Sequence, residues 1–297
     1  MENNFTKAQG ILRKFLLLQR RLATSIYKLK YRAKLIHSEV GIPTNLNRKL
    51  YKTIYGDYFL LNNTSCIDNN IKDFSVWEPE STSVIRNLVK PGNVVLDIGA
   101  NIGYYTVIMS KIVGETGKVL SFEPTKHFFD VLQHTVEINK LKNVALYDFG
   151  LSDKNVVSEI SIGEHSATIH WLKDSPRNGG TPLSVEQISL KRLDDVINSL
   201  NIDKIDFIKI DVDGHEPAFL EGALETLKKY KPTILMEIDH QHYRKAGYVA
   251  WDFYNKLREK GYHIYSEKDM SEYLNEDSFL VECGNFNAGT NIILRQD

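Results

Sequence analysis

The segment Asp97-Ile98-Gly99-Ala100-Asn101-Ile102-Gly103 joins a continuous apolar run, Asn93–Ile98, to a helical pattern, Tyr104–Val113. Gly99 and Gly103 have no Cβ, so the backbone can turn tightly there and lie against a ligand. A turn of this kind aims the N–H groups of the following helix at an anionic group. The segment therefore predicts the first strand–turn–helix unit of an α/β domain, with a ligand site at the turn.

Strand and helix patterns alternate on both sides of this turn. The predicted strands are Asn93–Ile98, Lys118–Glu123, Val144–Phe149, Ile205–Asp211, Thr233–Ile238, Tyr262–Tyr265 and Asn291–Arg295. The predicted helices are Pro79–Leu88, Tyr104–Val113, Lys126–Asn139, Glu216–Tyr230 and Val249–Lys260. Such alternation predicts parallel βαβ units in an open, doubly wound α/β sheet. Short alternating runs over residues 155–190 predict an inserted β-hairpin with a mobile tip.

Charge is distributed unevenly along the 297 residues, whose formal net charge is −1. Nine Lys and Arg residues and no acidic residue stand between Glu2 and Glu39, so the rest of the chain is acidic. An acidic body lacks the clustered cations of a phosphate-binding groove, which excludes a nucleic-acid partner. No run of 18 uncharged apolar residues occurs, so no transmembrane helix is predicted.

Residues 1–75 are predicted to be a basic accessory segment, separate from a main domain over 76–297. Within it, residues 7–38 have apolar side chains every three or four positions, which predicts one amphipathic helix. Two interpretations remain open for this helix: peripheral contact with an anionic inner membrane face, or packing on the main domain. With two cysteines and no signal-peptide pattern, a cytoplasmic location is expected. The oligomeric state is not indicated.

The residues around the first turn favour a particular cofactor. Asn101 stands where a dinucleotide-binding turn has the second glycine that admits a pyrophosphate. Glu123 ends the second strand, where a carboxylate accepts hydrogen bonds from both ribose hydroxyls. Asp97 suits an ammonium group, and Asn101 could bond a carboxylate. Together these residues predict S-adenosylmethionine rather than NAD or FAD.

The end of the third predicted strand can enclose an adenine ring. Gly150 leaves space for the ring, and Leu151 can pack on its face. Ser152 or Asp153 can bond the exocyclic amine. An ordinary loop is an equally good interpretation of this stretch.

Ionisable side chains gather at the ends of the fourth and fifth strands, where open α/β sheets bind their ligands. Asp211, His215 and Glu237 are the candidate catalytic residues, with His215 as the general base for a hydroxyl. A divalent metal held by Asp211 with Glu237 or Asp239 is a less favoured alternative, so no metal is predicted. His242 is expected to have no role. The acceptor would enter between Asp211, His215 and Glu237, with residues 160–185 as a lid.

Taken together, the motifs over about residues 76–296 resemble the FkbM-type methyltransferases. The resemblance is carried by Trp77-Glu78-Pro79-Glu80, Val95–Thr106, Ser121-Phe122-Glu123-Pro124, Leu193-Asp194-Asp195, Ile208–Glu216 and Leu235-Met236-Glu237-Ile238. It implies a seven-stranded class I methyltransferase sheet, and O-methylation of a hydroxyl on a sugar, polysaccharide, glycolipid or secondary metabolite. It also places Glu80 among the cofactor-binding residues, with Gly99 and Gly103. Asp213 departs from the family pattern, which has Glu more often there.

Three other functions were compared with O-methylation. A non-catalytic scaffold or a membrane-associated binding protein could keep the fold alone, but would not need Asp97, Gly99, Gly103 and Glu123. N-methylation of RNA or protein is disfavoured because no Asn-Pro-Pro-Tyr-like strand end is present. Asn101 disfavours an NAD-dependent oxidoreductase.

Overall fold

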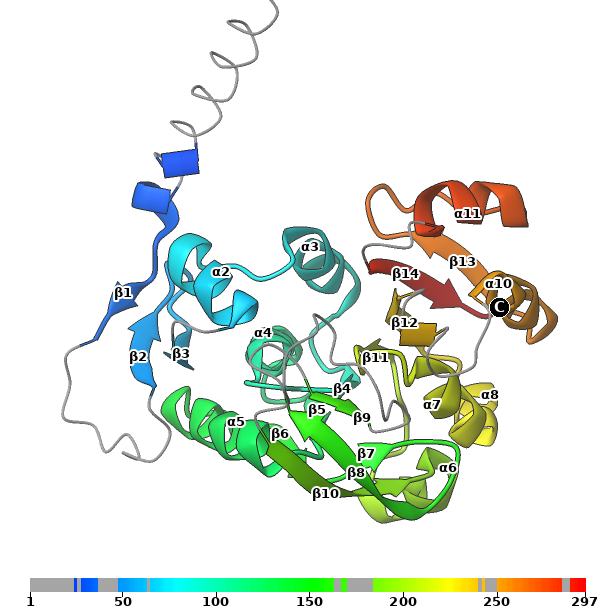
Figure 1. Ribbon diagram of the computed structural model, residues 1–297, viewed down its shortest axis with the longest axis horizontal. Coiled ribbons are helices and arrows are strands. Elements are labelled where there is room, and N and C mark those ends of the chain that lie inside the picture. The colour runs from blue at the N-terminus through cyan, green and yellow to red at the C-terminus, as the bar shows by residue number, and fades with distance from the viewer. Residues whose placement is uncertain are drawn as a thin grey trace, which may run out of the picture. The chain divides into compact units, whose positions relative to one another are not determined.

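The computed structural model describes residues 24–25, 28–36, 48–62, 65–162, 167–169, 184–239, 242–243, 250–284 and 289–297. The chain divides into two units, Met1–Trp77 and Glu78–Asp297 (Figure 1). Their boundary lies two residues beyond the predicted boundary at 75/76.

The first unit contains an antiparallel sheet of β1 (Lys34–Leu35), β2 (Lys49–Lys52) and β3 (Tyr58–Leu61), followed by α2 (Cys66–Phe74). The prediction of one helix over 7–38 is wrong at its C-terminal end. Residues 28–31 are helical, but Lys34–Leu35 pair with β2 because their backbone groups bond to that strand. Residues 7–23, 26–27 and 37–38 of the predicted helix lie outside the described residues.

The second unit is built on a seven-stranded sheet in the order β13, β14, β12, β11, β4, β5, β6. These strands are β4 (Val94–Ile98), β5 (Lys118–Phe122), β6 (Val144–Tyr147), β11 (Phe207–Ile210), β12 (Thr233–Ile238), β13 (His263–Ser266) and β14 (Thr290–Arg295). The strands from β12 to β6 are parallel, whereas β14 is antiparallel to both of its neighbours. This arrangement confirms the predicted doubly wound, mostly parallel sheet. Every residue of β4 and β11 is buried, as expected for central strands of such a sheet.

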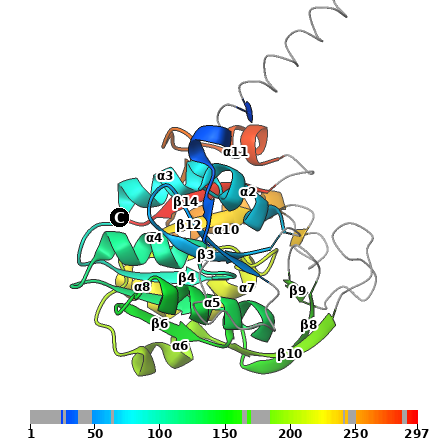
Figure 2. The same cartoon turned by 90° about the vertical axis from the view of Figure 1, so that its left-hand side faces the viewer.

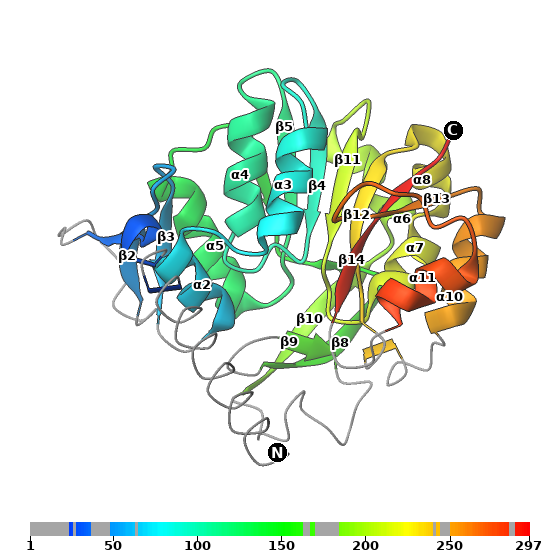
Figure 3. The same ribbon diagram turned by 90° about the horizontal axis from the view of Figure 1, so that it is seen from above.

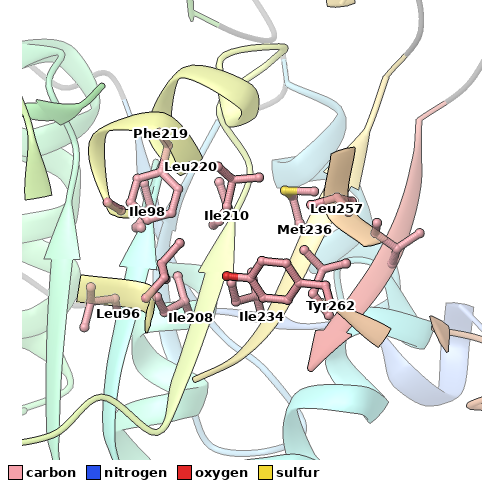
Figure 4. Packing of buried hydrophobic residues seen from close by; sticks show 14 of the residues in the cluster. Leu96, Ile98, Ile208, Ile210, Phe219, Leu220, Ile234, Met236, Leu257 and Tyr262 are labelled. Atoms are coloured by element: carbon pink, nitrogen blue, oxygen red, sulfur yellow. The ribbon is translucent and has the colours of Figure 1, made fainter. Parts of the chain in front are cut away.

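Helices cover both faces of this sheet (Figure 2). On one face, α3 (Pro79–Leu88) packs on α4 (Tyr104–Val113), and α4 covers β4 and β5 beside α5 (Lys126–Ile138) (Figure 3). The other face is apolar: Leu96, Ile98 and Ile210 belong to one buried cluster with side chains from the remaining helices (Figure 4). These helices are α6 (Leu193–Val196), α7 (Glu216–Gly222), α8 (Leu224–Tyr230), α10 (Ala250–Glu259) and α11 (Glu276–Cys283). Between α6 and β11 lies a 3-10 turn, η2 (Ile197–Leu200).

The helix predicted over Glu216–Tyr230 is in fact two helices, separated at Ala223. A Cβ atom at Gly222 would lie only 1.8 Å from the carbonyl oxygen of Ser152. The end of α7 therefore touches the backbone of the loop after β7, a contact that only glycine allows.

The predicted insertion forms a second sheet in the order β7, β10, β8, β9. Its strands are β7 (Gly150–Leu151), β8 (Val156–Ile162), β9 (Ala167–Ile169) and β10 (Ser184–Lys191), with β8 and β10 antiparallel along seven residue pairs. The third main-sheet strand ends at Tyr147 rather than Phe149, because Gly150 and Leu151 pair with β10 instead. The predicted mobile tip, residues 163–166 and 170–183, lies outside the described residues.

Candidate active site

The order of strands reverses beside β4. The chain runs from β4 through β5 to β6 and then returns to β11 on the other side of β4, and ligands of open α/β sheets bind at such switch points. Gly99, just after β4, has a φ angle of +79°. A Cβ atom there would lie 1.9 Å from the carbonyl oxygen of Asp211, just after β11. The two strand ends can meet because residue 99 is glycine.

A cleft lies at this switch point, where open α/β sheets bind their ligands. Seven residues predicted from the sequence line it: Gly99, Asn101, Glu123, Gly150, Leu151, Asp211 and His215. They come from four different strand ends, so the sheet topology brings them together.

Glu123 is almost fully buried at one side of the cleft. Its Oε2 accepts a hydrogen bond from the backbone N–H of Asn101 at 3.0 Å. Its Oε1 accepts two more, from Thr125 N at 3.0 Å and Thr125 Oγ1 at 2.6 Å. Burial raises the pKa of Glu123. These bonds hold its carboxylate in one orientation against the loop that follows β4.

Asn101 has a φ angle of +50°, a left-handed conformation that Asn tolerates better than most residues. Its Oδ1 accepts a hydrogen bond from Ile102 N at 2.8 Å. The side chain of Asn101 therefore stabilises its own turn, whereas its backbone N–H donates the hydrogen bond to Glu123.

One end of the cleft is apolar. Leu151 of β7, Phe128 of α5, Ile160 of β8 and Leu190 of β10 line it, all of them buried. A hydrogen bond from Lys126 N to Glu186 Oε2, 2.8 Å long, ties β10 to the start of α5. The inserted sheet is thus one wall of the cleft, on the side of Glu123 and Leu151.

Ser152 and His215 are partners. The Nε2 atom of His215 lies 2.9 Å from Ser152 Oγ, and Ser152 Oγ donates to Asp153 Oδ1 at 2.9 Å. Burial lowers the pKa of His215 to about 4, so the imidazole is neutral at physiological pH. His215 lines the cleft, but its Nε2 is already engaged.

A second group of polar side chains surrounds Lys209, which is almost fully buried. Its Nζ lies 2.7 Å from Asp211 Oδ2 and 4.7 Å from the centre of the Tyr105 ring. The Tyr105 hydroxyl donates to Glu78 Oε2 at 2.7 Å. Burial, reinforced by the charge of Asp211, raises the pKa of Glu78 to about 7. Lys209, Tyr105 and Glu78 were not assigned individual roles from the sequence, although a lysine inside an apolar strand was a usable signal.

Asp97 lies under α4, where Thr106 Oγ1 donates to its Oδ2 at 2.5 Å and is itself 2.9 Å from Ser121 Oγ. Its Oδ1 is buried without a hydrogen-bond partner, and burial raises the pKa of the carboxyl group. Asp97 is not among the described residues that line the cleft. Its carboxylate therefore contacts the covering helix α4, rather than lining the cleft as the sequence suggested.

Four more of the predicted site residues stand outside the described cleft lining. Gly103 caps α4, and a Cβ atom there would lie 2.8 Å from Leu132 Cδ1. Ser152 is buried behind His215, and Glu80 is exposed in the first turn of α3. Glu237 faces Gly289, where a Cβ atom would lie 1.9 Å from Glu237 Oε1. None of these four residues lines the described cleft.

His242, which was expected to have no role, is buried in the segment after β12. Its Nδ1 lies 3.2 Å from Asp239 Oδ2 and 3.9 Å from Asp213 Oδ1. Asp213 also lines the cleft. The Asp239–His242 spacing of three residues was visible in the sequence.

Two negative findings apply to the described part of the chain. No group of three or more His, Cys, Asp and Glu side chains there is arranged to hold a metal ion. Likewise, none of the helices within the described ranges is long and apolar enough to cross a membrane.

This chain is similar in sequence to a known protein family and to named proteins. The family model for the methyltransferase FkbM domain matches residues 97–280. AMB antimetabolite synthetase AmbE of Pseudomonas aeruginosa is 25% identical over 218 residues, which cover 61% of this chain and 10% of that protein. Methyltransferase sdnD of Sordaria araneosa is 28% identical over 174 residues, covering 48% of this chain and 64% of sdnD. The chain thus matches less than two thirds of the length of either relative.

Solved structures with a similar arrangement were also found. The methyltransferase FkbM from Methylobacillus flagellatus KT has a TM-score of 0.43 and 15% identity, covering 76% of this chain and 52% of that one. An O-methyltransferase from Bacillus cereus, in complex with SAH, has a TM-score of 0.42 and 16% identity, covering 74% of this chain and 81% of that one.

Proposed function

The chain belongs to the family of FkbM methyltransferase domains, and on that premise we propose that it is an S-adenosylmethionine-dependent O-methyltransferase. The proposed acceptor is a hydroxyl group of a sugar, polysaccharide, glycolipid or secondary metabolite. The observation that carries the proposal is the position of Glu123, held by three hydrogen bonds beside Gly99 and Asn101 in the cleft at the switch point.

The residues of the cleft fit the parts of S-adenosylmethionine. Glu123 would accept hydrogen bonds from the ribose hydroxyls. The adenine ring would lie in the apolar end formed by Leu151, Phe128, Ile160 and Leu190. The turn at Gly99 and Asn101, which lines the cleft, would face the methionine portion, because the start of a helix suits its carboxylate.

The charges behind the cleft also suit a cationic ligand. Lys209 is surrounded by three carboxyl groups, those of Asp211, Glu78 and Asp97, each of which raises its pKa against the opposing effect of burial. Asp211 is the one of these three carboxyl groups that is among the described lining residues of the cleft, and its charge would favour a ligand that carries positive charge. When bound, S-adenosylmethionine would supply an activated methyl group on its positively charged sulfur.

The acceptor side needs a group to orient the hydroxyl and take its proton. Asp211 lines the cleft with its side chain part-exposed, and Lys209 holds the carboxylate at 2.7 Å. We assign Asp211 the orientation of the acceptor hydroxyl. A residue that orients a hydroxyl in this way would suit O-methylation.

Calorimetric titration tests the cofactor. S-Adenosylmethionine, S-adenosylhomocysteine and NAD would each be titrated into wild-type protein and into Glu123→Gln. Binding of the first two and not of NAD is expected. Because the amide accepts fewer hydrogen bonds and carries no charge, Glu123→Gln should weaken both nucleosides by about ten- to a hundredfold. Glu137→Gln, an exposed change on α5, is the matched control and should bind as wild type.

The acceptor class is tested by the release of S-adenosylhomocysteine. Methyl glycosides with free hydroxyls would be compared with sugar amines of the same ring. Release with the glycosides alone is expected. Release with the amines alone would contradict O-methylation and leave the cofactor assignment intact, whereas absence of nucleoside binding would point to a non-catalytic scaffold.

A further inference from the structure

His215 lines the cleft at the start of α7, and its side chain is bonded to the loop after β7. Its Nε2 lies 2.9 Å from Ser152 Oγ. A second contact joins the same two segments, because a Cβ atom on Gly222 of α7 would lie 1.8 Å from the carbonyl oxygen of Ser152. Both His215 and Ser152 are buried, so the imidazole ring is held in one position at the edge of the cleft.

The hydrogen bonds of Ser152 decide which nitrogen of His215 carries the hydrogen. The Ser152 hydroxyl has a single proton and donates it to Asp153 Oδ1 at 2.9 Å. A bond to a carboxylate is stronger than one to a neutral ring, so the proton stays there. Ser152 Oγ then accepts from His215, which places the hydrogen of the ring on Nε2 and its lone pair on Nδ1.

The surroundings of His215 keep that lone pair available as a hydrogen-bond acceptor. Burial lowers the pKa of His215 to about 4, so the ring does not take up a proton near neutral pH. The side chain of His215 makes no capping bond to the backbone of α7, although the residue stands at the N-cap position.

His215 also stands beside the apolar end of the cleft. Leu151 lines that end, and Ser152, which is bonded to His215, is the next residue along the chain. An acceptor beside an apolar slot suits a flat heterocycle that carries an amino group at its edge. Adenine is such a ring, and the proposed function places it at this end.

The sequence suggested Ser152 or Asp153 as the partner of the adenine amine. Neither is among the described residues that line the cleft. Because they bond to each other and to His215, they orient the residue that does line it.

We propose that His215 recognises the adenine base of the cofactor, its Nδ1 accepting a hydrogen bond from the exocyclic amine, with Ser152 as the positioning residue. This inference rests on the proposed function. It gives His215 a part in donor specificity rather than in removing the proton of the acceptor.

Calorimetry in which ligand and protein are both varied tests the proposal. The ligands are S-adenosylhomocysteine and its analogue whose purine carries hydrogen in place of the exocyclic amine, so they differ in one donor group. Each would be titrated into wild type, into His215→Phe and into His134→Phe, a part-exposed control on α5. The ratio of the two dissociation constants is the measurement, because a loss of folded protein affects both titrations alike.

Wild type should bind the analogue about five- to tenfold more weakly than S-adenosylhomocysteine, since the bond from the amine to Nδ1 is lost. His215→Phe keeps a flat ring without the acceptor, and its two dissociation constants should agree within about twofold. His134→Phe should keep the wild-type ratio.

The tautomer is tested by ¹⁵N NMR of histidine-labelled protein, with the His215 signals assigned from their absence in His215→Phe. At neutral pH the shifts should show Nε2 protonated and Nδ1 unprotonated. Ser152→Ala removes the acceptor of the Nε2 hydrogen, so both tautomers should be populated and the ratio of dissociation constants should fall.

Two outcomes would overturn the proposal. A wild-type ratio retained in His215→Phe would show that another group recognises the amine, and a ring protonated on Nδ1 would have no lone pair to offer it. Either result would leave the proposed function standing, because S-adenosylhomocysteine would still have bound to wild type. If neither nucleoside binds to wild type, the proposed function fails and this inference fails with it.

Discussion

The α-carbon of Gly99 and the carbonyl oxygen of Asp211 are so close that a Cβ atom on residue 99 would lie 1.9 Å from that oxygen. The ends of β4 and β11 thus approach each other at a point where the backbone has no room for a side chain. The floor of the cleft depends on this approach, because Gly99 and Asp211 both line it.

Replacing Gly99 with Ala is expected to move the two strand ends apart. The change combines the strain of an L-residue at a φ of +79° with a clash against backbone, which together should cost about 2–4 kcal/mol of unfolding free energy. Gly261→Ala is the matched control, since Gly261 has a φ of +82° and nothing lies within 4 Å of its Cβ position. Calorimetry should show nucleoside affinity falling more than tenfold in Gly99→Ala alone. Equal losses in both variants would mean that only backbone strain matters.

Lys209→Met removes the cation that faces Asp211, Glu78 and Asp97. Leaving these carboxylates without their partner should lower the unfolding free energy by about 3–5 kcal/mol near neutral pH. The loss should be smaller at pH 5 than at pH 8, because the carboxyl groups whose folded-state pKa values rise can take up protons at low pH. Urea unfolding at both pH values measures it. Lys204→Met, which breaks the part-exposed pair with Asp206, should cost about 1 kcal/mol or less.

Glu216 gives the stability a dependence on pH. Burial raises its pKa to about 8 in the folded protein, whereas the unfolded chain releases this proton near the ordinary value. The folded state thus binds more protons between these values, and stability from this group falls as pH rises to about 8. Glu216→Gln keeps an acceptor for Val212 N and removes the proton. As pH rises from 5 to 8, we expect the unfolding free energy of Glu216→Gln to increase by about 2–4 kcal/mol relative to that of wild type.

Urea unfolding of Glu216→Gln and of Glu225→Gln, an exposed change on α8, would separate this effect from the general pH dependence of the protein. A constant difference between Glu216→Gln and wild type at every pH would show that Glu216 titrates normally.

His215 acts in the opposite direction. Burial lowers the pKa of His215 to about 4. Between about pH 6.5 and pH 4, the imidazole is therefore protonated in the unfolded chain and neutral in the folded protein. Stability from this group is complete above the unfolded pKa and is lost as pH falls. Between pH 7 and pH 5, the unfolding free energy of His215→Gln should therefore fall by about 1–2 kcal/mol less than that of wild type. His134→Gln, on α5, is the control in the same urea experiment, and an acid loss equal to that of wild type would refute the assignment.

The main sheet could be predicted from the sequence because its strands are continuous apolar runs bounded by turns. Leu96, Ile208 and Leu235 are buried, and an apolar run indicates a buried strand without knowledge of its neighbours in the sheet. The departure of Gly150 and Leu151 from the third strand could not be predicted, because their partner, β10, stands some 40 residues later. Gly222, just before the break at Ala223, lies against the backbone of Ser152, which is also far away in the sequence. Both features are set by long-range contacts that no local pattern carries.

The candidate site divides in the same way. Gly99, Asn101 and Glu123 were identified because their roles follow from their place at a strand end, and all three line the cleft. Asp97 was expected beside them, but its carboxylate bonds to Thr106 on the next helix. Whether a side chain near the end of a strand faces the cleft or the covering helix depends on tertiary packing. The approach of His242 to Asp213 likewise depends on tertiary packing, because the two residues follow different strands.

The reversal of strand order at β4 also separates the two walls of the cleft along the gene. Glu123 and Leu151 lie before β11 in the chain, whereas Asp211 and Asp213 lie after it. A single crossover near residue 205 could therefore join the ribose-binding half of one protein to the opposite wall of another. Such a hybrid would meet along the β4–β11 pairing, which makes new acceptor preferences accessible by recombination without rebuilding the ribose side of the donor pocket.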